Sequence, residues 1–241
     1  MKMKQFYKPG ICMNGDDFSM IEKDLSNKRL LLIGLIAAIV TVLGGELPIG
    51  WYKMPETDDT LMAQLGGYGN VSTFQLACGV FFGGIGIALQ SFGFEALSRI
   101  LGKDGQNPKT SKMIHIGALA CGFLGPVVHI LCIALMYVCR GNDIDEIMNF
   151  ALFIVAPICI VFMPVYMAMM VVMFIAIFKK KTVFPRCAAF LNPAIIMMAV
   201  NIITFFGGNN EIAHSLQMAN MGLGSVITFG GFFLLCKKQI Q

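Results

Sequence analysis

Long apolar runs dominate the sequence, and short polar segments separate them. Six runs read as almost continuously apolar, over about residues 30–50, 73–97, 113–139, 147–178, 188–207 and 212–236. The hydrocarbon core of a bilayer is about 30 Å thick, so an α-helix rising 1.5 Å per residue needs about 20 apolar residues to cross it. Barrel strands would instead be segments of about ten residues with alternating hydrophobicity. The pattern therefore predicts an all-α fold, a polytopic transmembrane bundle of about six membrane-spanning helices.

The overall composition agrees with a membrane-embedded chain. Of 241 residues, 56% are hydrophobic and only 13% are charged, and the mean hydropathy is +0.72. A soluble domain carries about 25% charged residues. There is too little polar surface here to cover a water-soluble globule.

The basic residues predict the orientation of the bundle. If alternate connections face the same side, all but two of the 18 Lys and Arg lie on the side of the termini, and only Lys53 and Arg140 lie on the other. Basic residues in short loops stay in the cytoplasm. We therefore expect both termini in the cytoplasm (N-in/C-in). The net charge of +4 then describes a surface that faces anionic membrane lipids, and no nucleic-acid partner is expected.

Two parts of the chain differ in character. Residues 1–28 are expected to be a cytoplasmic tail, and residues 29–241 a single transmembrane domain. In the tail, Asp16 and Asp17 precede apolar residues on one side of a helix, which predicts a short interfacial helix. The first apolar run begins near Leu30 and has no small-residue cleavage pattern after it, so it is expected to remain as an anchor.

The longest external connection, over residues 51–72, contains a helix signal of its own. Asp58, Asp59 and Thr60 precede the stretch Leu61–Leu65, which is followed by Gly66 and Gly67. Acidic N-caps and glycine C-terminal signals are typical of short helices. We expect this helix to cover the outer mouth of the bundle.

Ionisable and amide side chains within apolar runs are the main candidates for a site, because an unpaired polar group in hydrocarbon is costly. Those at the outer level are predicted to line one ligand-binding cavity: Glu46, His129, Asn201, His214, Gln217 and Asn220. The last three are spaced by three residues and share one helix face about 120° wide. The alternative is that these groups only hydrogen-bond one another and fix helix orientation.

Other polar and sulfur-containing residues have simpler interpretations. Glu95 and Arg99 have the i,i+4 order that favours a structural ion pair. The methionines between Met163 and Met173 are typical of apolar packing rather than of a Cu(I) site. The sequence has neither a CxxC pair nor an HExxH motif, so no metal site and no cofactor are predicted.

Four short motifs accompany this layout: GGELP at the end of the first run, PVVH in the third, FLNP at the start of the fifth and NMGLGS in the sixth. With these motifs, the chain after Lys28 resembles uncharacterised bacterial six-helix membrane proteins that are classed as domains of unknown function. The resemblance implies a multi-pass protein of a bacterial plasma membrane. It implies no activity and no catalytic residue.

Three functional classes are consistent with this pattern. The favoured hypothesis is binding or transport of a small molecule or lipid through the outer polar cavity. One alternative is an intramembrane enzyme acting on a lipid or isoprenoid, and the other is an accessory or immunity subunit. A transporter predicts a cavity that reaches both faces, an enzyme predicts clustered ionisable groups beside a lipid-accessible gap, and an accessory subunit predicts a filled interior.

Overall fold

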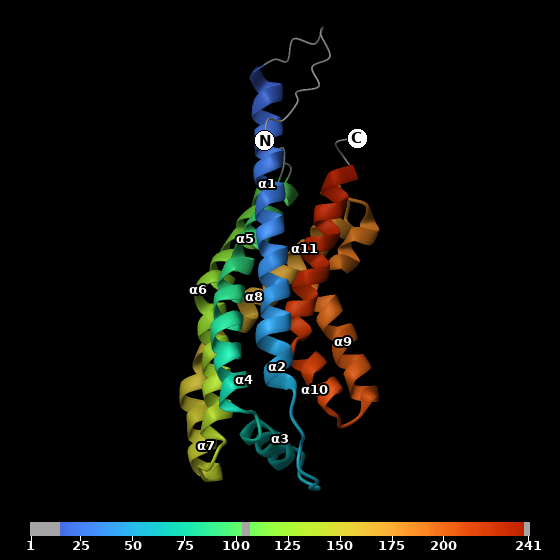
Figure 1. The fold of residues 1–241 in the computed structure, drawn as a ribbon. Helices are drawn as coiled ribbons and strands as arrows, with labels where there is room; N and C mark the ends of the chain where they lie inside the picture. Colours follow the sequence, from blue (N-terminus) through green and yellow to red (C-terminus); the bar gives the residue numbers. More distant parts are fainter. Residues whose placement is uncertain (1–14, 103–106, 239–241) are drawn as a thin grey trace, which may run out of the picture.

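The computed structural model describes residues 15–102 and 107–238, and every regular element in these two ranges is a helix (Figure 1). The α-helices are α1 (Gly15–Val40), α2 (Leu47–Gly50), α3 (Thr60–Gly69), α4 (Thr73–Cys78), α5 (Gly84–Leu101), α6 (Pro108–Val138), α7 (Ile144–Phe150), α8 (Ala156–Phe178), α9 (Pro193–Gly207), α10 (Glu211–Met218) and α11 (Asn220–Lys238). The predicted all-α fold is confirmed. The predicted tail helix is continuous with the first span in α1, and residues 1–14 of the tail lie outside the described residues.

Wide π-helical turns join several α-helices into longer continuous helices. In the described chain these turns are Thr41–Glu46 between α1 and α2, Gly79–Gly83 between α4 and α5, and Ala151–Val155 between α7 and α8. Pro48 and Pro157 follow the first and third turns closely. A proline lacks the backbone N–H and crowds the carbonyl four residues earlier, so a wider turn accommodates it. Correspondingly, the Leu47 N–H donates to the carbonyl of Val42, five residues earlier.

Four of the resulting helices are long and apolar enough to cross a membrane: Leu25–Gly50, Thr73–Leu101, Pro108–Val138 and Ile144–Phe178. Helices α10 and α11 meet at a bend of 59° and make a fifth span if they are counted together. The predicted helix over residues 188–207 is divided into a 3-10 turn, Arg186–Leu191, and the shorter apolar helix α9. By length and composition, the structure thus has four to five helices that could span a membrane.

The helices form a ring that is incompletely closed. Helices α1, α5, α6 and α8 pack side by side in that order, while α11 and then α9 continue the series on the other side of α1 (Figure 1). The two ends of this series, α8 and α9, touch each other only slightly. The 3-10 turn Arg186–Leu191 bridges α8 and α11. The ring therefore has a seam between α8 and α9.

The largest apolar core lies toward the end of the bundle where α1 begins and α11 ends. There Phe94 of α5, Met169 and Met173 of α8, and Phe229 of α11 are all at most 2% exposed. A Cβ on Gly117 of α6 would collide with the sulfur of Met169. The buried methionines of α8 are thus packing residues, as the sequence indicates.

Helix α3 crosses the opposite end of the bundle, which we call the α3 end (Figure 1). The Asp59 carboxylate accepts hydrogen bonds from the backbone N–H groups of Leu61 (2.9 Å) and Met62 (3.2 Å), so the predicted N-cap is confirmed. Gln64 donates through Nε2 to the hydroxyl of Tyr52 at 2.7 Å. Burial raises the pKa of that Tyr52 hydroxyl above its usual range, which keeps the phenol protonated at neutral pH.

An arginine at the end of the long helix α6 forms hydrogen bonds with the α3 end of the bundle. Arg140, just beyond α6, donates to the backbone carbonyl of Val71 and, at 2.8 Å, to the hydroxyl of Thr73. Thr73 is the first residue of α4. These bonds fix the connection between α3 and α4 above the interior of the bundle.

Candidate functional site

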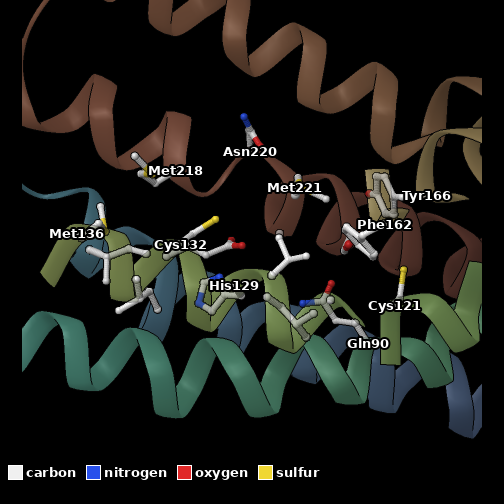
Figure 2. A pocket seen from close by; sticks show the side chains of 18 of the residues that line it. Gln90, Cys121, His129, Cys132, Met136, Phe162, Tyr166, Met218, Asn220 and Met221 are labelled. Carbon is white, nitrogen blue, oxygen red and sulfur yellow. The ribbon is translucent and has the colours of Figure 1, made fainter. Parts of the chain in front are cut away.

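An internal cavity of about 270 Å³ lies in the half of the bundle nearer α3. Figure 2 shows residues of α6 on one wall and residues of α10 and α11 on the facing wall. Most lining side chains are apolar or aromatic. The acidic, imidazole, amide and serine side chains among them are Glu46, Gln90, His129, Asn220 and Ser225.

Glu46 is the central polar group of this cavity. It ends the π-helical turn before α2 and is only 5% exposed. Its Oε2 atom lies so close to Gly222 of α11 that a Cβ on this glycine would collide with it. Within the described chain Oε2 has no hydrogen-bond partner, and no Lys or Arg is among the residues that line the cavity. Burying a carboxyl oxygen without such a partner costs free energy.

His129 reaches the cavity from α6. Its Nε2 lies 3.1 Å from the carbonyl oxygen of Gly79, at the start of a π-helical turn. A carbonyl only accepts hydrogen bonds, so Nε2 carries the hydrogen. The ring occupies the space that a Cβ on Gly83 would need. Glycine at position 83 therefore allows the imidazole to lie between α6 and the helix formed by α4 and α5.

Gln90 is a buried lining residue that the sequence analysis did not select. It donates through Nε2 to the hydroxyl of Thr41 at 3.0 Å, and Thr41 donates to the carbonyl of Ala37 at 2.9 Å. This chain of hydrogen bonds joins α5 to the helix that carries Glu46. The rule applied to the other amides, a polar side chain inside an apolar run, applies to Gln90 as well.

Asn220 lies at the edge of the cavity and points away from α6 (Figure 2). Its Nδ2 donates to Oδ1 of Asn201 on α9 at 2.9 Å. Asn201 in turn lines a groove of about 680 Å³ between α8 and α9. Met167, Met198 and further apolar side chains form the rest of that groove. The two amides thus separate the cavity from the seam in the helix ring.

The other two residues predicted for the cavity lie elsewhere. His214 is buried outside the cavity lining, where it stacks on Tyr52 with ring centroids 5.0 Å apart and places Nδ1 3.1 Å from the Tyr52 carbonyl oxygen. Gln217 is exposed and does not line the cavity. Of the six predicted residues, the structure brings together Glu46, His129 and Asn220, with Asn201 bound to the last.

Glu95 and Arg99 form an ion pair toward the opposite end of the bundle. Arg99 Nε lies 2.9 Å from Glu95 Oε1, and His115 Nδ1 of α6 lies 2.6 Å from Glu95 Oε2. Both carboxylate oxygens therefore have partners, and the Arg99 side chain is half exposed. This arrangement joins α5 to α6.

Aromatic and sulfur-containing side chains complete the cavity wall. Phe162 and Tyr166 of α8 have ring centroids 5.8 Å apart, and Cys121 of α6 lies on the same side of the cavity (Figure 2). Sequence patterns do not distinguish such residues from ordinary core residues. In the described chain, no group of three or more His, Cys, Asp or Glu side chains is placed to hold a metal ion.

Comparison with known proteins gives a family but no activity. No curated protein and no solved structure matches the chain. A family model described as a family of unknown function, DUF6796, matches residues 18–239. This match confirms the class of protein expected from the sequence motifs. The chain belongs to the DUF6796 family.

Proposed function

We propose that this protein crosses a bacterial plasma membrane six times, with both termini in the cytoplasm, and binds a small amphipathic molecule in the cavity near α3. The observation that carries the proposal is Glu46, a buried carboxyl group with an unpartnered oxygen beside an apolar cavity. Apolar pockets with a few convergent polar groups are typical of small-molecule sites. An ionisable group at membrane depth is itself an indicator of function.

Helix length and charge support the six crossings. Helix α9 alone has 15 residues and rises about 22 Å, and the preceding 3-10 turn Arg186–Leu191 lengthens the same apolar run. The beginning of α1 and the end of α11 lie at one end of the bundle (Figure 1). The other short connections on that side are rich in Lys and Arg, whereas Lys53 and Arg140 belong to the α3 end. Such a distribution is typical of a cytoplasmic face.

Reporter fusions test this orientation. We expect fusions after Lys53, Arg140 and Asn209 to report the outside, and fusions after Lys103 and Lys181 to report the cytoplasm. A cytoplasmic signal after Asn209 would contradict α9 as a full crossing, because α9 ends just before that residue.

The shape of the interior favours binding over a purely structural role. An accessory subunit would have a filled interior, yet about 270 Å³ remains open between the helices. Filling that space with additional side-chain atoms would bury more apolar surface and stabilise the bundle. A buried carboxyl group in the wall of that open space has a use when a ligand supplies its missing partner.

Two adjacent valines provide a test with a matched control. Val128 of α6 lines the cavity, whereas Val127 is 40% exposed and is not a lining residue. Wild-type protein reconstituted in nanodiscs with a single-chain neutral amphiphile, monododecanoylglycerol, should retain one molecule per chain in native mass spectrometry. Val128→Phe should lose this retention and Val127→Phe should keep it. Equal retention by both variants, or none by the wild type, would contradict the proposed function.

A further inference from the structure

The charge of the cavity identifies the class of ligand. Glu46 is the only acidic residue among the described residues that line the cavity, and His129 is the only basic one. The Nε2 hydrogen of His129 already faces the carbonyl oxygen of Gly79. The Glu46 Oε2 atom has no hydrogen-bond partner within the described chain. A ligand that donates a hydrogen bond and carries positive charge would supply what the site lacks.

The wall around this carboxyl group is also suited to a cation. Phe94, Phe162 and Tyr166 present aromatic rings, and three methionines, Met136, Met218 and Met221, add polarisable thioethers. The negative faces of aromatic rings attract ammonium groups, most strongly where water is excluded. A carboxylate ligand would instead bring a second acidic group beside Glu46 and the electron-rich rings, with no Lys or Arg among the described lining residues to pair with it. The cavity thus favours a positive head group over a negative one.

The size and position of the two hollows indicate the shape of the ligand. At about 270 Å³ the cavity is slightly smaller than typical small-molecule pockets of about 300–1,000 Å³, so it fits a head group or a small molecule rather than a two-chain lipid. The apolar groove between α8 and α9 lies directly beyond the hydrogen-bonded pair Asn220 and Asn201. It lies at the seam of the helix ring, where a chain could enter from the bilayer.

We propose that the ligand is a single-chain lipophilic ammonium, whose head group pairs with Glu46 in the cavity and whose apolar chain lies in the groove between α8 and α9. Separation of the Asn201 and Asn220 side chains would connect the groove with the cavity. This inference rests on the proposed binding function, which concerns the cavity alone. Beyond that function, the inference specifies the charge of the ligand and the path by which the ligand enters.

Three probes of equal chain length separate the contribution of head-group charge to the binding affinity from the contribution of the apolar chain. Dodecylammonium, dodecanol and dodecanoate are each titrated into nanodiscs that contain the wild-type protein, and bound molecules are counted by native mass spectrometry. We expect the ammonium to bind at least about tenfold more tightly than dodecanol, equivalent to about 1.4 kcal/mol. Dodecanoate is expected to bind most weakly. Glu46→Gln should bind the ammonium no better than dodecanol, and Glu46→Asp should retain the preference.

The outcomes distinguish the two proposals. Equal binding of dodecanol and the ammonium, or tightest binding of dodecanoate, would overturn the ammonium inference and leave the cavity as a binding site. Failure of all three probes to bind would overturn the proposed function itself. For the entry path, Met198→Trp in the groove should weaken binding of the ammonium, while Ile203→Trp, on the same helix and outside the groove, should not. Equal effects of these two substitutions would exclude the groove as the position of the chain.

Discussion

Two glutamates in helices that could span a membrane have opposite surroundings. Glu95, toward the end where α1 begins, has a partner for each oxygen: Arg99 forms an ion pair with Oε1, and His115 Nδ1 is hydrogen-bonded to Oε2. Glu46, toward the α3 end, is 5% exposed and has an oxygen without a hydrogen-bond partner in the described chain. Paired charges contribute to helix packing, whereas an unpaired buried group lowers stability. The comparison indicates that the region near α3 contributes less to the free energy of unfolding than the rest of the bundle does.

Packing differs between the same two regions. Around Phe94, Met169 and Phe229 the interior is filled by large side chains that are at most 2% exposed. Beside Glu46 a cavity remains, and the helix ring that surrounds it is open at the seam between α8 and α9. Sites for ligands commonly occupy less stable parts of a fold, because binding residues are not optimised for packing.

The largest expected effect concerns the glycine against which the Glu46 carboxyl lies. Gly222→Ala should lower the free energy of unfolding by about 1–3 kcal/mol, because the new methyl would collide with Oε2 and would lie 2.7 Å from Val42 Cγ2. Gly230→Ala on the same helix is the control, since its methyl would meet only Leu35 Cδ1 at 3.7 Å. That control should be neutral or slightly stabilising. Denaturation in mixed micelles measures both, and equal effects would show that the carboxyl does not lie against α11.

A smaller effect is expected from replacing each glutamate with methionine, which has similar length and no charge. Glu46→Met should raise the free energy of unfolding by about 1–2 kcal/mol, since it removes a buried carboxyl group whose Oε2 atom has no hydrogen-bond partner in the described chain. Glu95→Met should lower it, since Arg99 and His115 would lose their acceptor. The same denaturation measurement distinguishes the two. Loss of stability in Glu46→Met would mean that this carboxyl has a structural role and would break the contrast between the regions.

The sequence predicted the helices of this fold better than it predicted their breaks. Apolar runs of sufficient length identify α1, α5, α6 and α8, and Asp59 identifies the start of α3. The 59° bend between α10 and α11 has no proline or glycine at its centre, Ala219. A spacing of three places residues on one face only in a straight helix.

That bend explains why the predicted polar face is divided. His214 and Gln217 belong to α10, whereas Asn220 begins α11 and faces α9. Depth along each apolar run placed Glu46 and His129 at one level, and both line the cavity, because two side chains at one level meet if their helices are neighbours. Which helices are neighbours depends on tertiary packing, and the contributions of Phe162 and Tyr166 of α8 follow from that packing alone.

The smallest expected effect is the coupling within the paired region. A double-mutant cycle of Glu95→Ala and Arg99→Ala should give a coupling of about 0.3–0.5 kcal/mol, the usual size for an i,i+4 pair with one half-exposed partner. Lys53 and Glu211 near the α3 end offer a comparison pair, at 3.6 Å with the Lys53 side chain 83% exposed, and their coupling should be close to zero. The double variant at 95 and 99 should be less destabilised than the sum of the single variants, since removing both leaves no unpaired charge between these two residues. Strict additivity at this pair, measured in the same micelles, would mean that Glu95 interacts energetically with His115 alone. The stability of the paired region would then depend on contact between α5 and α6 rather than on an ion pair within α5.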